Sequence, residues 1–148
     1  MENERNLWEL WGQTNALYTE WCTKRDRNPY RLFVLYAING HEPITQKQIA
    51  DRTGLSKQTV ATVMRGLRDE GYVSLSAGAN DRREKYVHLT ESGSAYAHEM
   101  LAPLYKLENR VFGVMGEERI RQMTDAVSLF NTVFEKEMKG MRDERKQK

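Results

Sequence analysis

Apolar residues near the start of the chain recur with the spacing of one face of a helix. Their spacing predicts an amphipathic helix at about residues 4–24. A second helix is predicted at residues 29–39, because Pro29 is tolerated in a first turn and Asn39-Gly40 can end a helix. The apolar positions of the first helix are Leu7, Leu10, Trp11, Leu17, Tyr18 and Trp21.

A short helix, a tight turn and a longer helix follow between Thr45 and Gly71. Thr45 and Ser56 can cap the two helices, because a hydroxyl accepts from the first N–H groups, which lack helical partners. Gly54 ends the short helix, and the pattern is that of a helix-turn-helix. The longer helix has an apolar face with Val60, Val63, Met64 and Leu67, and an opposite polar face with Gln58, Thr62, Arg65 and Asp69.

Apolar and polar residues alternate at residues 72–76 and again at residues 85–89. Alternation of this kind predicts two strands, and the polar stretch 77–84 between them predicts a turn. A hairpin directly behind a helix-turn-helix is the order of a winged helix, which we expect at about residues 30–90.

Two long helices are predicted after the hairpin. Thr90 caps the first of them, in which Gly93 is an unfavourable early residue and Pro103 is expected to produce a kink. The segment 139–148 is expected to fray, because Met141 is its one large apolar residue. The last helix carries a heptad-like seam of Ile120, Met123, Val127, Phe130 and Phe134.

The fold class is therefore mostly α, an α+β winged helix-turn-helix with about six helices and a β-hairpin wing. We expect one domain over residues 1–148, because no linker or repeat divides the chain. An apolar fraction of 39% argues against disorder, and no apolar run approaches the ~20 residues of a membrane span. With one cysteine and no signal peptide, the expected location is the cytoplasm.

The net charge of +2 lies in the predicted winged helix, where residues 41–90 hold eight Lys or Arg against six Asp or Glu. An α-helix fits the DNA major groove, so the exposed face of the longer helix can read base edges. Lys57 and Arg65 can donate to guanine, and Gln58 can pair with adenine. Thr62 can contact a thymine methyl group. Ser56 and Thr59 can bind phosphates. The alternative is an ordinary solvated face. The candidate DNA-binding residues of this helix are Ser56, Lys57, Gln58, Thr59, Thr62 and Arg65.

The predicted turn of the hairpin contains Asp81, Arg82 and Arg83. Two adjacent arginines on a short hairpin can reach phosphates or the minor groove, whose negative potential attracts guanidinium groups. Asp81 is expected to orient an arginine. The alternative is a solvated turn without a function.

Residues 43–93 resemble the multiple antibiotic resistance regulator (MarR) family. The motifs that carry the resemblance are Ser56-x-x-Thr59-Val60, Leu67, Gly71, Val73, Asp81-x-Arg83 and Val87-x-Leu89-Thr90-x-x-Gly93.

The resemblance implies a bacterial or archaeal transcription regulator, by default a repressor, that binds double-stranded DNA as a homodimer. Helices at about residues 4–24 and 92–138 would interlock with those of the partner, and residues 56–70 would enter the major groove. Arg83 would enter the minor groove and Asp81 would position the wing. The family also often binds small aromatic or lipophilic effectors.

The seam of the last helix independently favours a dimer, since a domain of this size cannot cover both terminal helices; packing against the chain's own first helix is the alternative. A two-fold dimer would read a near-palindromic operator with half-sites ~34 Å apart. Trp11, Tyr18 and Trp21 can line an effector pocket, or they are core or interface residues. Cys22 is a candidate redox sensor if nearby Lys24 and Arg25 lower its pKa, and is otherwise an inert buried thiol.

No motif of an enzyme or a metal site is present, and His41, His88 and His98 are scattered. We therefore expect neither catalysis, nor a metal, nor another cofactor. The remaining alternative is a winged helix that binds only proteins. The salt dependence of binding distinguishes a DNA-binding protein from a protein-binding one, because DNA binding through several phosphates weakens steeply between about 50 and 200 mM salt.

Overall fold

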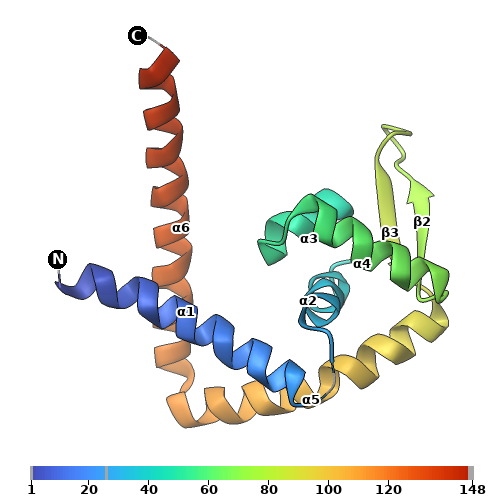
Figure 1. Ribbon diagram of the computed structural model, residues 1–148, viewed down its shortest axis with the longest axis horizontal. Helices are drawn as coiled ribbons and strands as arrows, with labels where there is room; N and C mark the ends of the chain where they lie inside the picture. The colour runs from blue at the N-terminus through green and yellow to red at the C-terminus, as the bar shows by residue number, and fades with distance from the viewer. Residues whose placement is uncertain (1, 26, 147–148) are drawn as a thin grey trace. The chain divides into compact units, whose positions relative to one another are not determined.

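The computed structural model describes residues 2–25 and 27–146 (Figure 1). Within them it contains six helices and a small antiparallel sheet, which confirms the predicted mostly α winged helix-turn-helix. The chain forms two compact units, the first ending at Pro103 and the second beginning at Leu104. The elements are α1 (Glu2–Thr23), α2 (Pro29–Ile38), β1 (Ile44–Thr45), α3 (Gln46–Thr53), α4 (Lys57–Asp69), β2 (Val73–Ala77), β3 (Lys85–Leu89), α5 (Glu91–Met115) and α6 (Glu117–Lys146).

Side chains next to the helix ends explain where the helices of the first unit begin. The Asn28 side chain accepts hydrogen bonds from the N–H groups of Tyr30 and Arg31 and caps α2. Thr45 caps α3 in a reciprocal capping box with Gln48. These bonds satisfy N–H groups that have no helical partner, and they confirm the predicted starts of α2 and α3.

The sheet has the strand order β1-β3-β2, with all pairs antiparallel. The hairpin β2–β3 confirms the predicted wing, whereas the two-residue strand β1 was missed. Val73 and Val87 are buried on one face of the hairpin, while Ser74 and Ser76 are exposed on the other. The large fully buried side chains of this unit include Leu32, Leu35, Ile38, Ile44, Ile49, Val60, Met64, Leu67, Val87 and Leu101.

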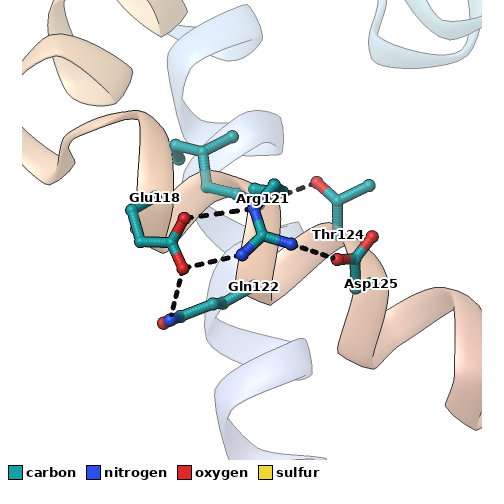
Figure 2. A network of polar contacts seen from close by, with 6 residues as sticks. Glu118, Arg121, Gln122, Thr124 and Asp125 are labelled. Carbon is teal, nitrogen blue, oxygen red and sulfur yellow. Dashed lines mark hydrogen bonds and ion pairs between the residues drawn. The ribbon is translucent and has the colours of Figure 1, made fainter.

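In the second unit, α6 is a long helix with charged pairs along its surface. The Arg121 guanidinium donates to the Glu118 carboxylate at 2.7 and 3.1 Å and to Asp125 at 3.2 Å, while Gln122 donates to Glu118 (Figure 2). The hydrogen bond from Arg121 lowers the pKa of Glu118. Pairs with these spacings support an exposed helix. The helix continues through Lys146, so the segment expected to fray is helical there, and residues 147 and 148 lie outside the described residues.

Pro103 lies inside α5, which is not interrupted at that point. Proline has no N–H, so the Glu99 carbonyl four residues earlier loses its usual helical donor. Arg27, from the loop before α2, supplies a replacement: its Nη1 donates to the carbonyl of Glu99 at 3.3 Å and to that of Met100 at 3.1 Å. Arg27 thereby anchors the α1–α2 loop to α5.

We expect Arg27→Met to lower the free energy of unfolding by about 1–2 kcal/mol, since it removes a charged donor from backbone carbonyls. The loss should shrink in a Pro103→Ala background, where a backbone N–H is restored that can donate to Glu99. Denaturant unfolding of the two single variants and the double variant measures this coupling. Strictly additive effects would contradict the role given to Arg27.

Candidate nucleic-acid interface

Ser56 fixes the start of α4. Its Oγ accepts from the Thr59 N–H at 3.0 Å and donates to the Thr59 hydroxyl at 2.9 Å. The preceding turn passes through Gly54 in the left-handed region, with a φ of 69°. Because Ser56 gives its proton to Thr59, the Thr59 hydroxyl is the one of the pair that remains to donate outward.

The two faces of α4 match the predicted pattern. Val60, Met64 and Leu67 are buried and attach the helix to the core. The predicted base-reading side chains Lys57, Gln58, Thr62 and Arg65 are all exposed. The Thr62 hydroxyl donates to the Gln58 carbonyl at 3.0 Å, which leaves its methyl group and lone pairs for an outside partner.

The tip of the hairpin is held by hydrogen bonds within the turn. The Gly78 N–H donates to the Glu84 carbonyl at 2.7 Å, and the Glu84 N–H donates to the Asp81 carbonyl at 3.1 Å. Oδ1 of Asp81 accepts from the Arg83 backbone N–H at 2.9 Å. The hydrogen bond of the Asp81 side chain is therefore to the Arg83 main chain, so the carboxylate holds the backbone of this arginine and not its guanidinium. Arg82 and Arg83 are both exposed.

Gly78 and Tyr86 also shape the tip, and neither role was predicted from the sequence. Gly78 is buried, and a Cβ there would lie 2.7 Å from the Asp81 carbonyl oxygen and 3.2 Å from the Tyr86 ring. The Tyr86 hydroxyl donates to Glu84, whose negative charge raises the pKa of Tyr86. A glycine in the turn was the available signal, but the tyrosine that packs over it is visible only in the structure.

The base of the wing is joined to the start of α5. Thr90 Oγ1 donates to the Gly71 carbonyl at 2.6 Å and accepts from the Gly93 N–H at 3.0 Å, which confirms the predicted cap. A Cβ on Gly93 would lie 2.7 Å from the Tyr72 carbonyl carbon and closer still to its oxygen. Gly93 is thus required by close packing, and interpreting it only as an unfavourable helix residue was wrong.

Gly66, on α4, has the opposite surroundings. A Cβ there would have no other atom within 4 Å. Close packing within the chain therefore does not account for this glycine.

The environment of Cys22 contradicts the lowered pKa expected for a sensor. The side chain is fully buried, and this burial raises the pKa of the thiol, with the charge of Arg27 acting in the opposite direction. Lys24 pairs with Glu20, and the Arg25 guanidinium lies 4.4 Å from the centre of the Trp21 ring. A buried thiol with a raised pKa is poorly reactive.

The candidate effector residues Trp11, Tyr18 and Trp21 are half-buried along α1. Their spacing places them on one side of that helix, but what they bind stays a prediction. Among the described residues, no group of three or more His, Cys, Asp or Glu is arranged to hold a metal ion. In the same residues, no helix has the length and apolar character needed to cross a membrane.

The model of the MarR family matches residues 28–84, which include α2, α3, α4 and β2. The chain is 33% identical over 85 residues to the HTH-type transcriptional regulator YwhA of Bacillus subtilis, covering 57% of this chain and 61% of that protein. It is also 33% identical over 66 residues to the HTH-type transcriptional regulator PetP of Rhodobacter capsulatus, covering 45% of this chain and 40% of the relative. The chain thus covers less than two thirds of the length of either regulator.

The fold is similar to that of NMB1585, a MarR family regulator from Neisseria meningitidis. The TM-score is 0.81 with 28% identity, over 93% of this chain and 97% of the other. The MarR family model thus matches the helix-turn-helix part of the chain, and the fold as a whole is similar to that of a MarR family regulator.

Proposed function

We propose that this protein is a sequence-specific transcription regulator that binds double-stranded DNA as a homodimer, and that it is a binding protein rather than an enzyme. The observation that carries the proposal is that one compact unit combines α4, whose polar face is exposed, with the β2–β3 hairpin, whose tip carries two exposed arginines. Figure 1 shows the course of this helix and this hairpin. Helix and wing are the two parts that a winged helix uses on adjacent grooves.

In this proposal α4 enters the major groove. Lys57 and Arg65 donate to guanine, Gln58 pairs with adenine, and Thr62 meets a thymine methyl. The Thr59 hydroxyl, whose own proton is not used in the bond with Ser56, binds a phosphate, while Ser56 acts mainly by holding Thr59 in place. The capped start of α4 adds the favourable interaction of a helix N-terminus with phosphate.

The wing enters the neighbouring minor groove in the same proposal. Arg83 inserts its guanidinium there and Arg82 contacts the backbone, since the narrow groove concentrates negative potential. The bond from Arg83 N–H to Asp81 holds the tip in one conformation before binding, so less conformational freedom is lost on contact with DNA.

Exposed apolar side chains on α1, α5 and α6 support the homodimer. Several large apolar side chains exposed along one helix are typical of an interface, and a second copy of the chain is the proposed partner. The Phe130 and Phe134 rings stack on α6 with centroids 5.7 Å apart, and Phe134 is 59% exposed. The large apolar side chains exposed on these helices include Leu7, Trp8, Leu10, Leu17, Val111, Phe112, Val114, Met123, Val127, Leu129, Val133, Phe134 and Met138.

A two-fold dimer presents two copies of α4 about one DNA turn (~34 Å) apart and reads a near-palindrome. Occupying such an operator in the cytoplasm blocks a promoter, which makes repression the proposed action. A small aromatic or lipophilic effector acting through the aromatic side of α1, formed by Trp11, Tyr18 and Trp21, is the proposed means of release.

We expect Phe134→Asp to convert the dimer into monomers, because it places a carboxylate in an apolar interface. Sedimentation at micromolar concentration measures the change. Thr132→Asp adds the same charge on the opposite side of the same helix, at an exposed polar position, and should leave the dimer intact. A stable Phe134→Asp dimer would remove this part of α6 from the interface.

Selection of bound duplexes from a random-sequence DNA pool at ~150 mM salt tests the function, since non-specific phosphate binding is weak there. The expected result is a near-palindrome with half-sites about one helical turn apart. A pool without enrichment, together with weak binding that does not depend on salt, would contradict the proposal and favour a winged helix that binds proteins.

A further inference from the structure

Four side chains form a cluster at the junction of α2, α4, the wing and α5. Arg31, in the first turn of α2, makes an ion pair with Glu70. Its guanidinium carbon lies 5.2 Å from the centre of the Tyr96 ring and 5.9 Å from that of Tyr72. The two tyrosine rings stack with their centroids 4.2 Å apart and their planes 4° from parallel. We call these four residues the Arg31 cluster.

The members of the cluster stand on both sides of the turn at Gly71, where the Gly71 N–H donates to the Arg68 carbonyl and the Tyr72 N–H donates to the Leu67 carbonyl. Glu70 is the C-cap of α4, and Tyr72 directly precedes β2. Between them lies Gly71, with a φ of 76° in the left-handed region that favours glycine. These three residues are the whole connection from α4 to the wing, so their dihedral angles decide how the two are directed relative to each other.

Arg31 is suited to fix that connection. It pairs with the carboxylate on one side of Gly71 and lies over the aromatic pair on the other. The rigid planar guanidinium can do both at once, and it compensates a negative charge that the C-terminus of a helix disfavours. The Arg31 side chain is only 24% exposed, so its interactions are partly shielded from solvent.

We propose that Arg31 is a positioning residue for DNA binding, because it holds Glu70 and Tyr72 across Gly71 and so fixes the angle between α4 and the wing. This inference rests on the proposed function, in which α4 and the wing must fit adjacent grooves at the same time. Arg31 acts through these neighbours and makes no phosphate contact of its own.

The test is Arg31→Met, which keeps the length of the side chain but removes the charge and the planar group. At a temperature where circular dichroism shows the variant folded, we expect the affinity for the selected duplex to fall about tenfold. The slope of log affinity against log salt should stay unchanged, since each phosphate contact contributes about 0.9 to it. Arg25→Met is the matched control, because Arg25 also lies over an aromatic ring but sits beside α1.

Two results would overturn the inference. Wild-type affinity combined with a lower melting temperature would make the Arg31 cluster purely stabilising. A smaller salt slope would instead make Arg31 a phosphate contact.

Should Arg31→Met fail to fold, Glu70→Gln removes the ion pair at a side chain that is 48% exposed and leaves the tyrosine stack in place. About threefold weaker binding with an unchanged salt slope supports the positioning role, and unchanged binding refutes it. If the wild-type protein itself binds no duplex, the proposed function falls together with the inference. If wild-type and variant bind alike, only the positioning role of Arg31 falls.

Discussion

Arg83→Ala is expected to weaken binding of the selected duplex by about 1–3 kcal/mol, which is roughly 5- to 150-fold. The variant removes the guanidinium from the tip of the wing and leaves the backbone N–H that Asp81 binds. Because Arg83 is exposed, the free energy of unfolding should not change. Titration of a labelled duplex at fixed salt gives the affinity, and denaturant unfolding gives the stability.

The control for Arg83→Ala is Lys24→Ala, which also removes one positive charge. Lys24 directly follows α1 and pairs with Glu20 of that helix. It should bind the duplex like the wild type. An Arg83→Ala protein that also binds like the wild type would exclude the wing tip from DNA recognition, leaving α4 as the remaining candidate.

Gly93→Ala is expected to destabilise the protein by about 3 kcal/mol or more, at the upper end for overpacking. The added methyl group would collide with the backbone carbonyl of Tyr72, which also accepts from the Thr90 N–H. The Tyr72 peptide is held by hydrogen bonds to Thr90 and to Leu67, so its carbonyl cannot move aside as a flexible side chain does. Denaturant unfolding at one protein concentration measures the loss, since the stability of a dimer depends on concentration.

The chain offers a matched control for this prediction in Gly66→Ala. Gly66 also lies in a helix, but a Cβ there has open space around it. We expect this variant to be more stable by up to about 1 kcal/mol, the difference in helix propensity between alanine and glycine. Equal effects at both glycines would contradict the packing explanation for Gly93.

Helix caps, the wing turn and the polar face of α4 were predictable, because each depends on residues that are close to one another in the sequence. The caps formed by Thr45 and Ser56 depend on partners three residues away, and the turn at Asp81 on a partner two residues away. The face of α4 follows from helical periodicity, and its exposure agrees with the prediction. In all these cases the residue types and their spacing contain the physical cause.

Other features depend on contacts between distant segments, and the sequence pattern did not reveal them. β1 has two residues and is a strand only because it pairs with β3. The thiol of Cys22 has a raised pKa because of burial, although cations stand next to it in the sequence. Spacing along the chain places Lys24 and Arg25 near Cys22 in the sequence. It does not show that Lys24 pairs with Glu20 and that Arg25 lies over the Trp21 ring.

Hydrogen bonds and periodicities over a few residues set the order of the elements, the winged helix-turn-helix, the exposed face of α4 and the place of the arginines in the wing. These features were therefore predictable from the residues alone. Only the packing of the folded chain explains why Gly93 must be a glycine, how Arg27 satisfies the carbonyls near Pro103, and how Arg31 joins Glu70 to Tyr72 and Tyr96. These depend on residues that are up to 73 positions apart and meet only after folding. Such contacts leave no local periodicity in the sequence, so only the packed chain shows them.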